Sequence, residues 1–270
     1  DFAFVMIPRV VEWYQVLLGC AKTGVVAMPG TNLLTAKDIE YRINRADARL
    51  AIVTAEHADK LQHIRLNCPS LEYLILIGAR RDGWSTLEDM CAEQPDTVDR
   101  ISLPETSADE LMLIYFTSGT TSMPKMVGRD HAYALAHSIT GDYWMDLSEN
   151  DVHWTLTDTG WAKAAWGLLY PPLLAGASVV LYDGEGFDAD LHLKIIAQQR
   201  VTTFCAPPTI YRVLAQKDLS DADFSSLRHC FGAGEPLNPE AMRSWKAATG
   251  CDIYDGYGQT ETINIVANFP

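Results

Sequence analysis

The 270-residue sequence contains no apolar run long enough to cross a membrane as a helix, and its six cysteines include no Cys-x-x-Cys pair. Positive charge is also scarce: 21 Lys and Arg stand against 35 Asp and Glu, which gives a net charge of −14. This charge makes non-specific binding to nucleic acids or acidic membranes unfavourable. Several cysteines lie inside apolar segments, which indicates reduced, buried thiols and favours a cytoplasmic or mitochondrial-matrix protein.

What the sequence does contain is typical of a globular protein. Hydrophobic residues make up 48% and charged residues 21%, and the length allows one large domain or two medium ones. The chain starts at Asp1 inside an apolar run and stops at Pro270 directly after another. We therefore expect both ends to be cut through structure, with any targeting signal lying outside this sequence.

Short apolar runs alternate with longer amphipathic segments along the whole chain. The runs predict strands that are buried on both faces, at residues 25–28, 50–54, 73–77, 111–116, 151–157, 178–182, 202–206, 227–231 and 252–257. The segments between them predict helices, at residues 8–24, 35–46, 85–90, 131–144, 161–176, 189–200, 208–216 and 239–250. This alternation predicts an α/β fold with mainly parallel sheets flanked by helices.

Local signals predict where some helices begin and where the chain divides. Thr35 with Asp38, and Ser85 with Glu88, have the spacing of a capping box. The polar stretch at residues 92–110 separates two β/α blocks. We therefore predict a first subdomain at 1–105 and a second at 106–270.

A polar loop follows the apolar run at residues 111–116. It reads TSGTTSMPK over residues 117–125, with five hydroxyl side chains, one glycine and a closing lysine. Glycine lets a backbone approach a ligand, and hydroxyls, N–H groups and a lysine can all donate to phosphate oxygens. No Walker A pattern can be written here. From the residues alone, the loop is either a phosphate-binding loop or a solvated polar turn.

Four segments resemble, in the same order, motifs of the adenylate-forming superfamily, which contains acyl-CoA synthetases, peptide-synthetase adenylation domains and luciferases. They are TSGTTSMPK (117–125), DTGW (158–161), GAGEPLNPE (232–240) and DGYGQTET (255–262). The intervening sequence, including PPTIYRVL (207–214), is most similar to medium-chain acyl-CoA synthetases. The likeness covers essentially the whole chain. Taken singly, GAGEP could be a strand-to-helix turn, and the tryptophan of DTGW could be a core residue.

The resemblance implies an enzyme that joins ATP to a carboxylic acid, giving acyl-AMP and pyrophosphate, and then transfers the acyl group to coenzyme A. It implies that the β- and γ-phosphates are held by Thr117, Ser118, Gly119, Thr120, Thr121, Ser122, Met123, Pro124 and Lys125. It places adenine and the α-phosphate along Gly234, Glu235, Pro236, Asp255, Gly256, Tyr257, Gly258, Gln259 and Thr260. Ser122 departs from the family pattern, in which many members have glycine.

The resemblance also implies the reacting groups. Lys125, Thr260 and Glu261 are the predicted catalytic residues, with Glu261 holding Mg²⁺. Outside this motif, Glu261 would be read as an ordinary exposed acid. An apolar acyl pocket is predicted at Trp161, Ala206, Tyr211 and Ala233, although these residue types are also typical of a plain core.

The family's small C-terminal lid domain, with its catalytic lysine, is expected to lie beyond Pro270. We therefore expect this piece to bind nucleotide but to turn over poorly. Two other readings are open: an adenylation domain that loads a carrier-protein thiol, and a non-catalytic nucleotide-binding module.

Overall fold

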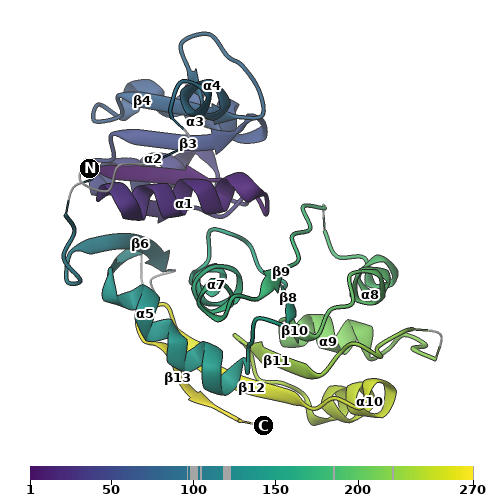
Figure 1. Ribbon diagram of the computed structural model, residues 1–270. Helices are drawn as coiled ribbons and strands as arrows, with labels where there is room; N and C mark the ends of the chain where they lie inside the picture. The colour runs from purple at the N-terminus through teal and green to yellow at the C-terminus, as the bar shows by residue number, and fades with distance from the viewer. Residues whose placement is uncertain are drawn as a thin grey trace. The chain divides into compact units, whose positions relative to one another are not determined.

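The computed structural model describes residues 1–95, 97, 103, 105–117, 123–184, 186–220 and 222–269. The chain forms two compact units (Figure 1): unit 1 comprises Asp1–Tyr133 with Asp158–Ala162, and unit 2 comprises Ala134–Thr157 with Lys163–Pro270. This division differs from the predicted boundary at residue 105. The strand at Leu111–Thr117 pairs with the strand at Val26–Pro29, so the stem of the predicted phosphate loop belongs to the first unit.

Unit 1 is built on a seven-stranded sheet with the order β5-β4-β3-β1-β2-β6-β7. All neighbouring strands are parallel except β6 and β7. The apolar run at the start of the chain forms a central strand, β1, which was not among the predicted strands. The strands are β1 (Phe2–Met6), β2 (Val26–Pro29), β3 (Leu50–Thr54), β4 (Tyr73–Ile77), β5 (Ser85–Thr86), β6 (Leu111–Thr117) and β7 (Lys125–Asp130).

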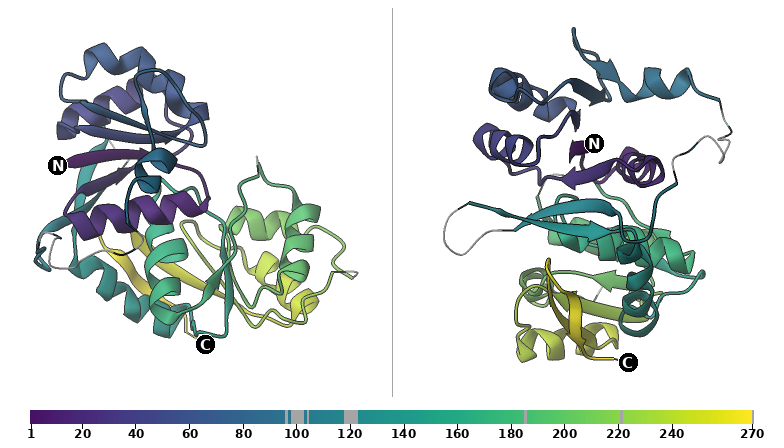
Figure 2. Two further views of the ribbon diagram at one scale, coloured as in Figure 1. Left: turned by 45° about the horizontal axis from the view of Figure 1, so that its top comes forward. Right: turned by 90° about the vertical axis from the view of Figure 1, so that its left-hand side faces the viewer.

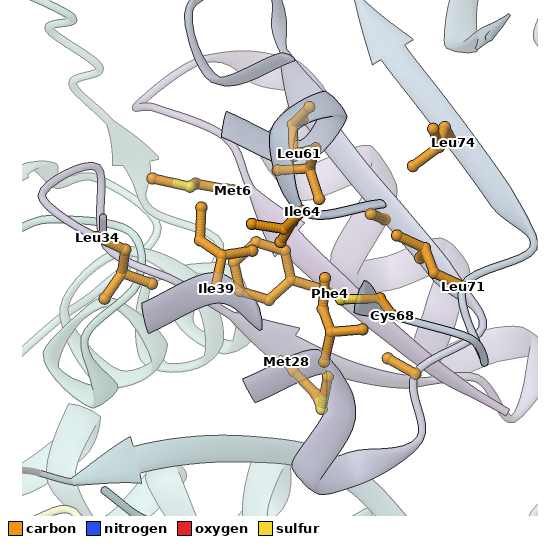
Figure 3. Close-up of a cluster of buried hydrophobic side chains, with 14 of the residues drawn as sticks. Phe4, Met6, Met28, Leu34, Ile39, Leu61, Ile64, Cys68, Leu71 and Leu74 are labelled. Atoms are coloured by element: carbon orange, nitrogen blue, oxygen red, sulfur yellow. The ribbon is translucent and has the colours of Figure 1, made fainter. Parts of the chain in front are cut away.

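Helices cover both faces of this sheet, with α1 on the opposite face from α2 and α3 (Figure 2, right-hand view). Phe4 and Met6 of β1 pack against α2 and α3 in a cluster of buried apolar side chains (Figure 3). Burial of this kind contributes about 25 cal/mol per Å² of apolar surface. The helical segments are α1 (Val11–Thr23), α2 (Ala36–Ala46), α3 (Ala55–Ile64) with a 3₁₀ turn (Arg65–Asn67), and α4 (Leu87–Ala92).

The capping predictions have different outcomes. The Thr35 hydroxyl and the Asp38 carboxylate form the reciprocal capping box predicted for α2. The prediction for α4 is wrong by one residue, because the Thr86 hydroxyl, not Ser85, accepts the bond from the Asp89 N–H. Glu88 instead accepts from the backbone N–H of Gly78 at 2.7 Å, which ties α4 to the end of β4.

Unit 2 contains a six-stranded sheet with the order β13-β12-β11-β10-β8-β9, parallel except for the β12–β13 pair. The two chain segments predicted as helices at 131–144 and 161–176 each contain a π-helical turn. The strands are β8 (Val152–Thr155), β9 (Ser178–Val179), β10 (Thr203–Cys205), β11 (His229–Ala233), β12 (Ile253–Gln259) and β13 (Ile263–Ala267). The helices are α5 (Ala132–Ile139) with a π-turn (Thr140–Trp144), α6 (Ala162–Ala164) with a π-turn (Ala165–Leu169), α7 (Tyr170–Ala175), α8 (Ala189–Gln198), α9 (Pro208–Leu214) and α10 (Pro239–Thr249).

The second π-turn has a local cause. Pro171 has no N–H, so the carbonyl of Gly167 cannot receive an α-helical bond from it. The imidazole of buried His153 donates to that carbonyl instead, with an Nε2–O distance of 2.9 Å. Burial lowers the pKa of His153 to about 4, so the ring is neutral at pH 7. The sheet and this irregular helix are thereby joined through a satisfied polar contact.

The two faces of the unit 2 sheet carry separate apolar clusters. The cluster that contains Phe204, Ala206 and Tyr211 packs against helices α8, α9 and α10. The cluster on the other face contains Cys205 and Phe231, with Trp144 and Trp166 from the two π-turns. Residues 204 and 206 face one way and 205 the other, as alternation along a strand requires. From here on, these are called the Phe204 face and the Cys205 face.

Asp151 and Arg228 join the chain just before β8 to the chain just before β11. Asp151 is buried, and its oxygens accept from the Arg228 guanidinium at 2.7 and 2.8 Å. Burial raises the pKa of Asp151, but the bonds from Arg228, Thr202 and Ser148 outweigh it and lower the pKa to about 2. Arg228→Leu is expected to lower the free energy of unfolding of unit 2 by about 2–4 kcal/mol, because it leaves a buried carboxylate without its cation.

Urea denaturation at pH 7 measures this effect. Lys246→Met is the matched control, since it removes an ion pair to Asp252 at 2.7 Å that is exposed, and it should cost less than about 1 kcal/mol. The Asp151 contribution is fully present above its ordinary pKa of 3.8 and is lost as the pH falls through about 2. Equal losses in the two variants would contradict the prediction.

Candidate nucleotide and acid site

The GAGEP and DGYGQTE segments lie on neighbouring strands of unit 2. β11 and β12 are parallel, with Gly232 opposite Asp255 and Ala233 opposite Gly256 (Figure 1). The carboxyl ends of both strands therefore reach the same edge of the sheet, where open α/β sheets place their ligands. Gly234, the first residue beyond β11, has a φ of 109°, a conformation that favours glycine.

Two residues at this edge, Tyr257 and Asp255, have side-chain groups that a ligand could contact. The side chain of Tyr257 is 56% exposed, which leaves an aromatic face available for stacking. The Oδ1 atom of Asp255 is buried and has no hydrogen-bond partner among the described residues. Burial raises the pKa of this carboxyl. A buried acceptor without a donor is costly unless a ligand supplies one.

A tight hairpin between β12 and β13 carries the predicted catalytic residues of unit 2. The Gln259 N–H donates to the Thr262 hydroxyl at 3.1 Å, and the Thr262 N–H donates to the Gln259 carbonyl at 3.1 Å. A Cβ on Gly258 would lie 1.9 Å from the carbonyl oxygen of Ile263, so only glycine fits this bulged hairpin. Thr260 and Glu261 lie at the hairpin tip, where Glu261 is exposed.

The metal prediction rests on Glu261 alone. Within the described parts of the chain, no group of three or more His, Cys, Asp or Glu residues is arranged to hold a metal ion. Mg²⁺ at nucleotide sites commonly uses one or two carboxylates together with phosphate oxygens and water. A single exposed carboxylate at the hairpin tip therefore fits an ion that arrives with the nucleotide, and does not fit a permanent metal site.

The predicted phosphate loop connects two antiparallel strands of unit 1. Thr117 ends β6 and pairs with Lys125, which begins β7 and has an exposed side chain. The Tyr41 hydroxyl donates to the carbonyl of Pro124 at 3.0 Å, and Met123 is 49% exposed. The predicted phosphate ligands at Ser118, Gly119, Thr120, Thr121 and Ser122 lie outside the described residues. The structure thus describes the two ends of the loop. The strand β7, which follows the loop, was not predicted from the sequence.

The DTGW segment anchors the chain within unit 1. Asp158 accepts from the backbone N–H of Asn32 at 3.2 Å, and the Thr159 hydroxyl donates to the carbonyl of Ile7. A Cβ on Gly160 would lie 2.1 Å from both the carbonyl carbon of Gly30 and the nitrogen of Thr31. The motif therefore has a structural role in this fold, in addition to any role of Trp161, which is 58% exposed.

The predicted acyl-pocket residues differ in their burial and in the unit to which they belong. Ala206 and Tyr211 have no exposed surface and lie in the core on the Phe204 face, where the Tyr211 hydroxyl donates to the carbonyls of Phe204 and Phe231. Ala233 packs on the Cys205 face instead. Trp161 belongs to unit 1. The core reading fits the burial of Ala206 and Tyr211, and the pocket assignment of all four residues stays a prediction.

One residue that sequence reasoning missed is Lys163. It lies two positions after DTGW, in the otherwise apolar run WAKAAWGLL, and its Nζ atom is buried between the Trp166 ring, whose centre is 5.5 Å away, and the Cys205 thiol. The signal in the sequence was a single lysine within an apolar run, since lysine side chains are seldom buried. Helix periodicity alone does not indicate a function for such a residue.

The chain belongs to the AMP-binding enzyme family, whose model matches residues 1–270. It is similar along its full length to mitochondrial acyl-coenzyme A synthetases. It is 41% identical to ACSM3 of Mus musculus, with 100% of this chain and 46% of the relative covered. It is also 41% identical to ACSM4 of Homo sapiens, with coverages of 99% and 46%. The chain thus spans about half the length of these curated relatives.

Two solved structures share the fold. The anthranilate CoA ligase AuaEII, in complex with anthranoyl-AMP, matches with a TM-score of 0.93 and 32% identity, covering 100% of this chain and 52% of its own. The acyl-CoA synthetase of Brucella canis matches with a TM-score of 0.87 and 27% identity, covering 100% and 49%. Both support the prediction of mainly parallel sheets flanked by helices, as found in adenylate-forming ligases.

Proposed function

We propose that this chain supplies the nucleotide- and acid-binding part of an AMP-forming acid–CoA ligase. The observation that carries the proposal is the carboxyl edge formed by β11 and β12, where Tyr257 is exposed and the Oδ1 of Asp255 has no hydrogen-bond partner in the described part of the chain. The relatives, which are acyl-coenzyme A synthetases, agree with it. The proposed substrates are ATP, a carboxylic acid and coenzyme A.

The proposed chemistry brings a carboxylate to the α-phosphorus of ATP, so two anions must be held in line and their charge neutralised. The carboxylate oxygen bonds to phosphorus, the bond to pyrophosphate breaks, and the thiol of coenzyme A later displaces AMP. Mg²⁺ bound at Glu261 would supply charge neutralisation at the phosphates. Lys125 and the loop hydroxyls would hold the departing pyrophosphate, and Thr260 would orient the α-phosphate and the acid.

Tyr257 and Asp255 would bind the nucleotide. The exposed ring of Tyr257 offers a face for stacking on adenine, and Gly234, Glu235 and Pro236 are exposed beside it at the end of β11. Asp255 would accept from a donor on the nucleotide, which would satisfy its buried oxygen. We also propose a cytoplasmic or mitochondrial-matrix location, in keeping with the mitochondrial relatives. Among the described helices, none is long and apolar enough to cross a membrane.

ATP–pyrophosphate exchange with a panel of straight, branched and aromatic acids tests the function. We use the longest natural polypeptide that contains these 270 residues, beside the 270-residue chain alone. Exchange that depends on one class of acid supports the proposal, and nucleotide binding without exchange by the short chain is expected. A product assay that offers coenzyme A and a carrier-protein thiol separates the two acceptors. Nucleotide binding by the longer polypeptide with no exchange for any acid would favour a binding module instead.

A further inference from the structure

Two cysteines of unit 2, Cys230 and Cys251, bring their thiols into contact. Cys230 is the second residue of β11 and has no exposed surface, whereas Cys251 lies just before β12 and is partly exposed. The two side chains are within hydrogen-bonding reach of each other. Both pack into the apolar cluster on the Phe204 face. The proposed ligase chemistry uses neither thiol.

The pairing of the two strands explains why these thiols meet. Cys230 is opposite Ile253 in the parallel β11–β12 pair, and Cys251 precedes Ile253 by two residues. Side chains two positions apart lie on the same face of a strand, so Cys251 is directed to the side that Cys230 faces. Cys251 lies outside the registered pairs of this ladder and follows Gly250, which ends α10 with a φ of 77°. Its sulfur can therefore approach Cys230 without disturbing the paired residues of the strands.

The two thiols have different environments. The Cys230 sulfur accepts from the indole N–H of Trp245 at 3.3 Å, and burial raises the pKa of Cys230 well above its ordinary value. The Cys251 thiol donates to the carbonyl of Leu227 at 3.2 Å. The hydrogen bond with Cys230 lowers the pKa of Cys251 to about 7, although burial raises it. Because the thiolate is the reactive form of cysteine, Cys251 is the nucleophile of the pair, and Cys230 is a thiol held beside it.

A pair of thiols can also belong to a metal site, but a structural zinc site needs four ligands. Among the residues that the structure describes, no third His, Cys, Asp or Glu joins these two thiols in a group arranged to hold a metal ion. The arrangement of the pair therefore favours redox chemistry over metal binding.

We propose that Cys230 and Cys251 form a redox-modification site, at which a hydroperoxide oxidises the two thiols to a disulfide. The Cys251 thiolate attacks one peroxide oxygen and the O–O bond breaks, which gives a sulfenic acid and releases the other oxygen, with the thiol proton, as an alcohol or water. The Cys230 sulfur then bonds to the Cys251 sulfur, the S–O bond breaks, and the hydroxyl group leaves with the Cys230 proton as water. The electron pair that reduces the peroxide comes from the two thiols.

The disulfide closes a ring of chain over residues 230–251. This ring contains α10 and residues 234–236, the segment predicted to line adenine. A disulfide restricts the unfolded chain, so oxidation ties this segment to both strands of the proposed nucleotide site. In a reducing compartment such a bridge is transient, and a thiol reductant restores the pair. The inference goes beyond the proposed function, because it is independent of the acid that the site takes.

Peptide mapping of the longest natural polypeptide that contains the chain tests this inference. The folded protein is treated with hydrogen peroxide, the remaining thiols are alkylated, and trypsin is added. Trypsin cleaves after Arg243 and Lys246, between the two cysteines, so a bridge joins two otherwise separate peptides. The joined peptides should have a mass about 2 Da below the sum of their thiol forms and should separate on treatment with dithiothreitol. They should be at least about 10-fold more abundant than any other joined pair of cysteine peptides.

Cys91→Ser is the matched control, because Cys91 is an exposed thiol on α4 of unit 1, and its removal should leave the bridge unchanged. Cys230→Ser should abolish the bridge and leave a sulfenic acid at Cys251, which dimedone labels, and Cys251→Ser should abolish both products. A thermal melt checks folding, and where a variant does not fold, the map of the unmodified protein decides.

The inference is overturned if no joined peptide containing Cys230 and Cys251 appears, or if all cysteine pairs are joined in equal amounts. It is also overturned if Cys91→Ser removes the bridge. Failure of ATP–pyrophosphate exchange would count against the proposed function and would leave this inference unaffected.

Discussion

Glu261→Gln should lower the rate of ATP–pyrophosphate exchange by about 10²- to 10³-fold, the size of effect seen when a group that stabilises transition-state charge is removed. The substitution keeps the shape of the side chain and removes the charge at the tip of the β12–β13 hairpin. Because Glu261 is exposed and the hairpin is held by the backbone and Thr262, the fold should tolerate the change. Raising the Mg²⁺ concentration should restore part of the rate.

Glu240→Gln is the control for this prediction. Glu240 is also an exposed glutamate of unit 2, but it lies in the first turn of α10, away from the hairpin tip. Its substitution should leave the exchange rate within about twofold, since exposed surface changes seldom have larger effects. Equal rates for Glu261→Gln and Glu240→Gln would show that Glu261 does not hold the metal. A loss that is independent of Mg²⁺ would show the same.

Gly160→Ala should lower the free energy of unfolding of unit 1 by about 3 kcal/mol or more, among the larger effects of a single substitution. The new methyl group would lie 2.1 Å from the backbone of Gly30 and Thr31, and neither backbone atom can turn aside as a flexible side chain would. The segment at 158–162 must then move away, which breaks the bonds to Asn32 and Ile7. Denaturant titration and amide hydrogen exchange at Asn32 measure the effect.

Gly19→Ala is the opposite case in the same unit. Gly19 lies inside α1, and apart from its chain neighbours and the adjacent backbone of its own helix, no described atom lies within 4 Å of the position that a Cβ would take. Alanine there should be neutral or stabilise the helix by up to about 1 kcal/mol, because it reduces the freedom of the unfolded chain. The close-approach argument for Gly160 fails if both alanine variants have the stability of the unmodified protein.

Much of the fold could be predicted because its signals are local. Strands such as Leu50–Thr54 and Tyr73–Ile77 are apolar runs flanked by helix signals, and the Thr35–Asp38 capping box fixes the start of α2. β7 was missed because it is an edge strand with a largely polar sequence, KMVGRD. It also follows a loop rich in hydroxyl side chains, which drew the interpretation towards phosphate binding. The predicted boundary at residue 105 differs from the division into the two units, because the pairing of β6 with β2 is a long-range contact that composition does not reveal.

The site was predictable where the chain itself places residues together, and less so where faces matter. Gly234 and Tyr257 lie at one edge because β11 and β12 are adjacent parallel strands. The opposite orientation of Ala206 and Ala233 depends on strand parity in the folded sheet, and an apolar residue type does not reveal which face it occupies. Lys163 was missed for a related reason, since the burial of its ammonium depends on Trp166 and the packing of an irregular helix.

The way in which the chain passes between the two units limits how the protein can be dissected. The polypeptide changes unit after residues 133, 157 and 162, so the short Asp158–Ala162 stretch is an insert of one unit in the sequence of the other. A single cut therefore separates neither unit intact. Expression from residue 134 onward would include Gly160 without the Gly30 backbone on which it packs, and expression up to residue 133 would include the Gly30 backbone without Gly160. To crystallise unit 2 alone, residues 158–162 would have to be replaced by a linker. To crystallise unit 1 alone, the same segment would have to be supplied as a separate peptide.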